Sequence, residues 1–214
     1  MKKLLSVLLA LALLASPVLA VEWKTPSTPK IVKPAVESFD YVIWEGETDA
    51  DMLKQARQDL ERARGNGQTL VVTLISPGGP IIMSLEIARL VKVARDRGQL
   101  VEIKGSGIIA SGGTFVLAAG TPGRRYISKY TFFLVHPPQA RSFLSEPTCL
   151  TVTPDPKTVN EKIFNTFLFI MRDMYMEFTK KPQEEVEKWL TCGNEVVGSG
   201  ALAVTMGMAD EVRE

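Results

Sequence analysis

The sequence is poor in the residues that build metal centres, and it has no excess of charge of either sign. Its 214 residues include one histidine and two cysteines. A single histidine without Cys, Asp or Glu at ligand spacing beside it does not build a zinc site, so we expect neither a metal nor a cofactor. Lysine and arginine number 25 against 24 aspartates and glutamates. This balance argues against nucleic acid or an anionic lipid surface as a partner.

Long apolar runs are also scarce, and the one of note lies at the N-terminus. It covers residues 4–15, follows Lys2 and Lys3, and leads through a proline into small residues that end at Ala20. This is the pattern of a cleavable signal peptide. The run is shorter than the roughly 20 apolar residues that a membrane-spanning helix needs, although retention as an anchor is the alternative. We predict a signal peptide over 1–20, no membrane span after its removal, and a periplasmic or secreted protein.

The remaining chain divides into an arm and one domain. Residues 21–38 contain three prolines among lysine, serine and threonine, which favours an extended arm. Residues 39–214 have the length of a single α/β domain.

The two cysteines predict a disulfide. In an exported protein, Cys149 and Cys192 meet an oxidising environment, where two cysteines in one small domain are more often paired than free. The alternative is a catalytic cysteine, which would take His136 away from any serine because there is no second histidine.

Apolar runs of strand length alternate with helical patterns along the domain. Because the strands are apolar throughout, we predict an α/β fold whose mostly parallel sheet is flanked by helices on both faces. We expect a loop over 139–156. The expected strands are 41–44, 70–75, 100–103, 125–127 and 131–135, and the expected helices are 49–65, 81–97, 114–119, 157–179, 183–190 and 200–206.

Ser111 is the first candidate for chemistry. It stands between an apolar strand and an apolar helix and is followed by Gly112 and Gly113, which permit close backbone approach. This is where a nucleophile would be displayed. The alternative is a serine that only caps the helix.

A second glycine turn, at Ser76-Pro77-Gly78-Gly79, also joins a strand to a helix. If the two strands are neighbours, the free N–H groups of the two turns converge and form an oxyanion hole for a tetrahedral intermediate. The alternative is a pair of tight turns needed only for packing.

His136 closes the last of the apolar strands and is the candidate general base. An imidazole titrates near neutral pH and can accept the proton of a serine hydroxyl. The alternative is a histidine that is buried and satisfied within the core.

Three segments of the chain resemble the Clp protease proteolytic subunit. VVTLISPGG at 71–79 is similar to its strand and SPGG turn, GIIASGGTFVLAAG at 107–120 to its nucleophile segment, and FLVHPP at 133–138 to its histidine segment. The segments keep the family's order, and 136 − 111 = 25 residues is the family's separation of nucleophile and base. The resemblance covers most of residues 70–140.

The resemblance implies a site and a fold. Ser111 would be the nucleophile and His136 the base, with the N–H groups of Gly79 and Gly112 as the oxyanion hole. The fold would be the ClpP/crotonase-like spiral of ββα units. The family's long helix mediates assembly, so a homo-oligomer is expected, and Asp210 near the C-terminus would be structural.

The third member of the triad departs from the family's pattern. The position of the family's catalytic aspartate falls on Glu195, whose carboxylate could orient the imidazole as aspartate does. Asn194, or a Ser–His dyad without a third partner, are the alternatives, and Glu195 would then be a solvated loop residue. The motif Ser111-Gly112-Gly113 is more similar to that of the signal peptide peptidases, which use a lysine as the base. The nearest lysine before Ser111 is Lys104.

Together these features predict an exported serine endopeptidase that cleaves short or unfolded polypeptides. Since the ATP-driven unfoldases of the Clp family are cytoplasmic, this chain would act without one. Two alternatives stay open: a ClpP-like binding or scaffold protein whose catalytic site has decayed, and another enzyme on the crotonase fold.

Overall fold

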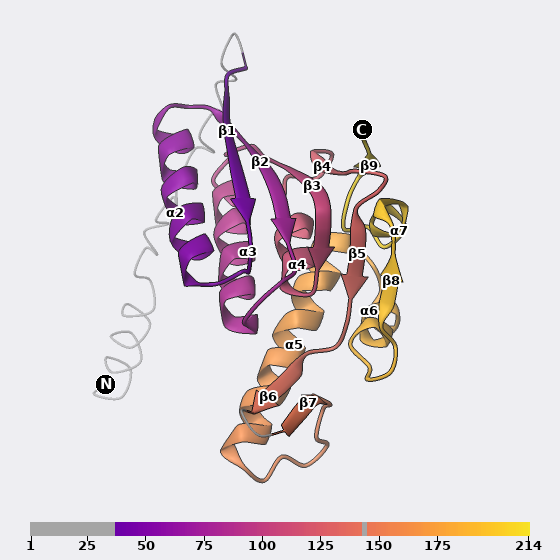
Figure 1. Ribbon diagram of the computed structural model, residues 1–214. Coiled ribbons are helices and arrows are strands. Elements are labelled where there is room, and N and C mark those ends of the chain that lie inside the picture. The colour runs from indigo at the N-terminus through magenta and orange to yellow at the C-terminus, as the bar shows by residue number, and fades with distance from the viewer. Residues whose placement is uncertain (1–36, 143–144) are drawn as a thin grey trace, which may run out of the picture. The chain divides into compact units, whose positions relative to one another are not determined.

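The computed structural model describes residues 37–142 and 145–214 (Figure 1). The predicted signal peptide and the predicted arm up to residue 36 lie outside the described residues. The last two residues of the arm are held against the domain. The carbonyl of Ser38 accepts a hydrogen bond from Thr69 N, and Glu37 forms an ion pair with Arg124.

The centre of the domain is a seven-stranded sheet, and the predicted parallel α/β fold is confirmed (Figure 1). All its strand pairs are parallel except β5 with β8. The long strand β3 pairs with β4 along its first half and with β5 at its end. The strands are β1 (Phe39–Glu45), β2 (Thr69–Ser76), β3 (Val101–Ala110), β4 (Arg125–Ile127), β5 (Phe132–Val135), β8 (Val196–Gly198) and β9 (Glu211–Val212).

The helices α2 and α5 begin at residues whose side chains cap them. Asp49 accepts hydrogen bonds from two N–H groups of the first turn of α2, and Thr158 forms a capping box with Glu161 at the start of α5. Figure 1 shows α2 to the left of β1, and α3 and α4 behind the strands of the sheet. The helices are α2 (Ala50–Gly65), α3 (Ile81–Asp96), α4 (Gly112–Ala119), α5 (Val159–Thr179), α6 (Gln183–Trp189) and α7 (Gly200–Thr205).

The prediction that helices cover both faces of the sheet was wrong at the edge strand β1. Trp44 is fully buried, whereas Tyr41 and Ile43 are 69% and 58% exposed. Buried and exposed side chains alternate along this strand because only one of its faces meets α2.

None of the helices in the described ranges is long and apolar enough to cross a membrane.

Strand β3 is longer than the sequence predicted, and this length positions the site. It runs through Gly105 and Gly107, which we expected to end it, as far as Ala110. A Cβ at Gly105 would lie 3.0 Å from a side-chain carbon of Ile109, so the absence of a side chain there lets the strand continue. Ser111 is therefore displayed at the end of the strand, with no loop in between.

The expected loop over 139–156 was partly wrong, because it contains a two-stranded hairpin. Strand β6 (Gln139–Ser142) pairs antiparallel with β7 (Ser145–Cys149). These strands lack the apolar alternation by which strands are predicted, and Pro147 lies within one of them.

The predicted disulfide is confirmed. Cys149 and Cys192 are bonded, with Cα atoms 6.0 Å apart, and they join the end of β7 to the segment before β8.

Candidate active site

Ser111 adopts a backbone conformation that is rare for any residue other than glycine. Its φ is 50° and its ψ is −123°, and Lys180 is the only other non-glycine residue with positive φ in the described ranges. Such a conformation costs about 1–3 kcal/mol and persists only where surrounding contacts impose it. The Ser111 side chain makes no capping hydrogen bond to α4. The alternative of a serine that serves only as a helix cap is therefore wrong.

The two glycine turns are in direct contact. A Cβ at Gly78, where φ is +94°, would lie 2.5 Å from the Cβ of Ser111 and 2.7 Å from the N atom of Gly112. Only glycine fits there. Among the described residues, the N–H groups of Gly79 and Gly112 donate no hydrogen bond. Two unsatisfied donors thus lie on adjoining turns at the starts of α3 and α4, where the helix dipoles are positive.

A pair of buried hydroxyls supports these turns from behind, and no pattern in the sequence predicts this pair. Thr48 Oγ1 and Ser84 Oγ are 2.6 Å apart, and both residues are fully buried. A Cβ on Gly112 would collide with Ser84 Oγ and approach Thr48 Oγ1 to 2.8 Å. The turn that bears Gly112 is therefore packed tightly against α3.

His136 lies immediately after β5, beside Ser111. Ala110 is opposite Leu134 in the parallel ladder, and Ser111 N donates to the Leu134 carbonyl over 2.9 Å. With strands about 4.8 Å apart and a rise of about 3.3 Å per residue, this register puts the Cα atoms of Ser111 and His136 roughly 6 Å apart. Both residues are half-buried.

The imidazole is held by the backbone of its own turn. His136 Nδ1 lies 2.7 Å from the carbonyl oxygen of Pro137. A carbonyl oxygen only accepts, so this contact places the ring proton on Nδ1 and leaves Nε2 as a proton acceptor. The Ser111 hydroxyl makes no hydrogen bond to a described residue, and such catalytic contacts often tighten only when substrate binds.

Glu195 is adjacent to His136 but does not contact it. Val135 pairs with Val196 in the antiparallel ladder, so one step further the register sets Glu195 opposite His136. Glu195 and Asn194 are exposed, and the Glu195 carboxylate has no hydrogen bond or ion pair within the described ranges. Glu195 therefore lies next to the candidate site, while Nδ1 of His136 is hydrogen-bonded to the Pro137 carbonyl.

Lys104 is not placed to act as a base. It lies in the middle of β3, whereas Ser111 follows the last residue of that strand. Its amine forms an ion pair of 3.1 Å with Glu102.

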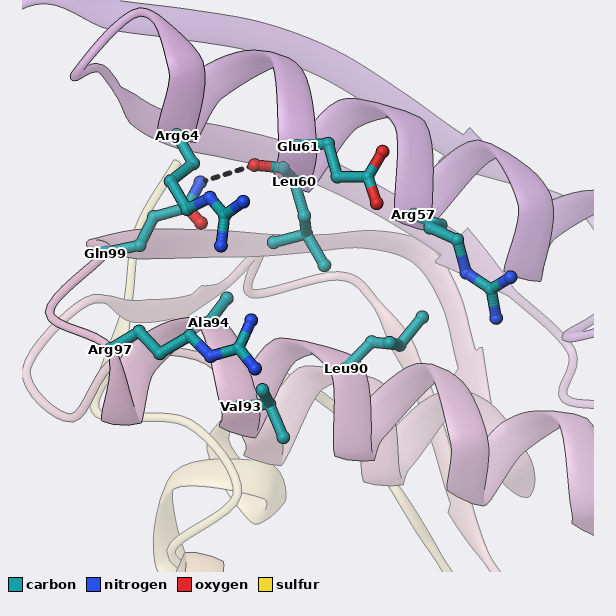
Figure 2. A pocket seen from close by; sticks show the side chains of 9 residues that line it. All are labelled: Arg57, Leu60, Glu61, Arg64, Leu90, Val93, Ala94, Arg97 and Gln99. Carbon is teal, nitrogen blue, oxygen red and sulfur yellow. Dashed lines mark hydrogen bonds between the residues drawn. The ribbon is translucent and has the colours of Figure 1, made fainter.

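A surface hollow between α2 and α3 is separate from these residues. Figure 2 shows the guanidinium groups of Arg64 and Arg97 directed from opposing helices into the gap, which the buried residues Leu60 and Ala94 also line. It lies in the C-terminal halves of the two helices, whereas Ser111 lies near the start of α3. Its lining contains no serine, cysteine or histidine.

Helix α5 leaves several large apolar side chains uncovered. Val159 is 72% exposed, and Ile163, Phe169 and Ile170 are each at least 40% exposed. Apolar side chains that recur along one helix form a surface suited to contact with another protein chain.

Comparison with known proteins agrees with the geometry of the two turns and the histidine. A family model described as Clp protease matches residues 41–214, which include every candidate site residue and all strands but the first two residues of β1. Comparison with curated proteins found no match. Proteins of this family are peptidases and typically form oligomers. The family match covers most of the length of the chain, and it includes the strained serine, the glycine turn that packs against it and the histidine that follows the adjoining strand. The chain therefore belongs to the Clp protease family.

Proposed function

We propose that this protein is an exported serine endopeptidase with Ser111 as nucleophile and His136 as general base. The observation that carries the proposal is the strained backbone of Ser111, whose side chain caps no helix and faces the Gly78 turn. Strain of this kind at the end of a strand is retained where it serves a site.

The arrangement supports acyl transfer in two steps. Ser111 Oγ adds to the carbonyl carbon of the scissile peptide bond while its proton passes to Nε2 of His136. The N–H groups of Gly79 and Gly112 stabilise the oxyanion. As the intermediate collapses, the C–N bond breaks and His136 gives its proton to the departing amine. Water, activated by the same histidine, then hydrolyses the acyl-enzyme and restores Ser111.

Labelling with an alkyl fluorophosphonate tests the proposal. Ser111 Oγ displaces fluoride from phosphorus, so the protein should gain one phosphonyl group, located at Ser111 by peptide mass mapping. Labelling should be absent in Ser111→Ala and in His136→Ala, and unchanged in the control Ser106→Ala, which alters a serine five residues earlier on β3. An unreactive wild-type protein would identify the chain as a decayed, non-enzymatic member of its family.

The third role of the triad is proposed to be divided between two groups. The Pro137 carbonyl fixes the tautomer of His136 but carries no net charge, so it stabilises the imidazolium only weakly. The carboxylate of Glu195, opposite His136 in the extended ladder, supplies negative charge without a direct contact. An exposed charge acting in this way contributes on the order of 1 kcal/mol.

Glu195→Gln should therefore lower kcat only about 3- to 10-fold, and the loss should shrink as salt is raised. Steady-state kinetics at low and high salt measure this, with Asn194→Ala as the neutral control. A loss above a thousandfold would mean that Glu195 binds the imidazole directly, as a triad aspartate does. Unchanged turnover would leave Glu195 as a solvated residue.

Export is part of the proposal. The signal peptide pattern over 1–20 predicts it, and a disulfide between Cys149 and Cys192 is the state expected of an oxidising compartment. The mature protein would begin at Val21, which N-terminal sequencing of periplasmic or secreted material checks. In such a compartment the enzyme would act on short or unfolded polypeptides without a cytoplasmic ATPase.

We further propose that the exposed apolar face of α5 joins copies of the chain into a homo-oligomer. The assembly typical of the family supports this, and so does the exposure of Val159, Ile163 and Ile170, which lie within about 40° of one another around the helix. Sedimentation of the mature protein tests it. Ile170→Glu should dissociate the assembly, and an unchanged sedimentation coefficient would place the contact elsewhere.

A further inference from the structure

A chain of buried hydroxyl groups leads from α5 to the backbone of Ser111. Thr114 Oγ1 lies 2.5 Å from the carbonyl oxygen of Ser111 and 2.7 Å from the hydroxyl of Tyr175. Thr114 is fully buried and Tyr175 is 1% exposed. The two residues are 61 positions apart in the sequence.

The direction of these hydrogen bonds follows from their chemistry. The Ser111 carbonyl only accepts, so the single proton of the Thr114 hydroxyl points to it. Thr114 Oγ1 must then accept from Tyr175, whose hydroxyl is the donor. Burial raises the pKa of Tyr175, which keeps its proton in place at all physiological pH values. The order is Tyr175 to Thr114 to Ser111.

The Ser111 carbonyl belongs to the same peptide group as the Gly112 N–H. In a trans peptide the C=O and N–H bonds are antiparallel and lie in one plane. The structure contains no cis peptide bond in its described ranges. Holding the carbonyl oxygen of Ser111 on the Thr114 side therefore aims the Gly112 N–H to the opposite side, away from the helix interior.

The peptide groups on both sides of Ser111 are held by hydrogen bonds. Ser111 N donates to the Leu134 carbonyl of β5, which carries His136 two residues later, and Thr114 N also donates to the Ser111 carbonyl over 3.1 Å. These contacts are what impose the rare φ of Ser111. Tyr175 is the outermost link, fixed by a stacked contact with Phe115 at 4.0 Å and an edge contact with Trp189 at 5.9 Å between ring centroids.

We propose that Tyr175 is a positioning residue that orients the oxyanion-hole amide of Gly112 through Thr114. The inference rests on the proposed function, because it deepens the role given to Gly112. It requires that loss of the Tyr175 hydroxyl should weaken stabilisation of the transition state and leave ground-state binding of substrate unchanged.

Saturation kinetics with an alkyl fluorophosphonate separate the two effects, since its phosphoryl oxygen enters the oxyanion hole as the Ser111 Oγ–P bond forms and the P–F bond breaks. Tyr175→Phe should lower the maximal rate of phosphonylation about 10-fold with the half-saturating concentration unchanged. Thr114→Val, which removes the hydroxyl at nearly constant volume, should lower it about 30- to 100-fold. Thr114→Ser keeps the hydroxyl and should restore the rate to within about 3-fold of wild type.

The double variant Tyr175→Phe/Thr114→Val should be no slower than Thr114→Val alone, because the chain is already broken at its inner link. Tyr126→Phe is the matched control. It removes a tyrosine hydroxyl that donates to the Gly123 carbonyl, away from Ser111, and should react at the wild-type rate. Urea denaturation of each variant establishes that it is folded under the assay conditions.

The outcomes distinguish this inference from the proposal beneath it. A reactive wild-type protein whose Tyr175→Phe variant reacts at full rate would overturn the positioning role alone. So would losses that multiply in the double variant, since independent effects point to general destabilisation. A wild-type protein that does not react would overturn the proposed function and this inference with it.

Discussion

Replacing His136 by alanine is expected to lower kcat for peptide hydrolysis by roughly 10⁴- to 10⁶-fold, about as much as removal of the nucleophile Ser111. The serine hydroxyl is a weak nucleophile without a base to take its proton. Within residues 37–142 and 145–214, neither other candidate is placed to replace His136: Lys104 is paired with Glu102 in the middle of β3, and Glu195 faces solvent across the ladder.

The single histidine permits an independent measurement without mutation. Diethyl pyrocarbonate acylates imidazole, and it should inactivate the wild-type enzyme in proportion to modification of one residue per chain when the protein carries no histidine tag. Added imidazole should restore part of the activity of His136→Ala, and none of the activity of Ser111→Ala. If His136→Ala kept more than about one hundredth of the wild-type kcat, the base would have to be another group.

The fold could be predicted from the sequence because its signals are local, and the candidate pair Ser111 and His136 was found from the same kind of signal. The strand–turn–helix units at Ser76 and at Ser111 show apolar runs interrupted by glycine, and such runs need no knowledge of distant residues. The pairing of β3 with β5 brings Ser111 and His136, each of which follows one of these strands, close together. Helix boundaries agreed closely where a capping residue marks them, as Asp49 does for α2.

The structural features that could not be predicted from the sequence depend on contacts between distant segments of the chain. Strand β8 has three residues, and it exists because it pairs with β5, while the β6–β7 hairpin has no apolar alternation to reveal it. The contact of Thr114 with Tyr175 joins residues 61 positions apart, so no local sequence pattern could have predicted it. The bond from His136 to the Pro137 carbonyl depends on how one turn closes, which a residue pattern does not determine.

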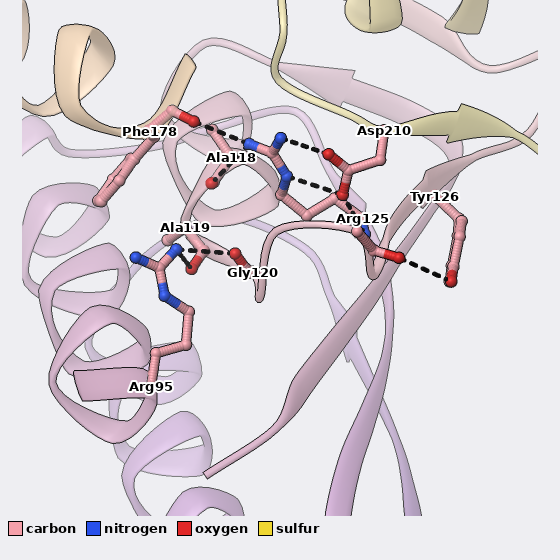
Figure 3. A network of polar contacts seen from close by, with 9 residues as sticks. Arg95, Ala118, Ala119, Gly120, Arg125, Tyr126, Phe178 and Asp210 are labelled. Carbon is pink, nitrogen blue, oxygen red and sulfur yellow. Dashed lines mark hydrogen bonds and ion pairs between the residues drawn. The ribbon is translucent and has the colours of Figure 1, made fainter. Parts of the chain in front are cut away.

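A second large effect is expected from Asp210, and this one is on stability. Asp210→Ala should lower the free energy of unfolding by about 2–3 kcal/mol, somewhat less than removal of one partner from a fully buried ion pair, because the Asp210 side chain is 22% exposed. The carboxylate accepts hydrogen bonds from the backbone N–H and the guanidinium of Arg125, whose side chain is 8% exposed. Figure 3 shows the same guanidinium reaching the carbonyl groups of Ala118 and Phe178.

These two carbonyls lie at the C-terminal ends of α4 and α5, where helices leave acceptors unsatisfied. Arg125 therefore ties together the helix that begins at Gly112 and the helix that carries Tyr175, and Asp210 holds Arg125 in place. Without the carboxylate, a buried positive charge is left uncompensated. Urea denaturation at neutral pH measures the loss, and Glu211→Ala is the matched control. That residue pairs with the exposed Arg213, two residues later in the chain, so its removal should cost far less stability than removal of Asp210.

The same interaction should disappear in acid. Burial alone would raise the pKa of Asp210, but hydrogen bonds from Arg125 and its charge outweigh burial and hold the pKa below its ordinary value of 3.8. A carboxyl whose pKa is lower in the folded than in the unfolded state stabilises the fold above the unfolded value and loses that contribution as pH falls through the folded one. The difference in unfolding free energy between wild type and Asp210→Ala should thus be full at pH 6–7 and should shrink steadily below about pH 4. A difference that stayed constant from pH 7 down to the acid limit of folding would show that Asp210 acts through packing and not through its charge.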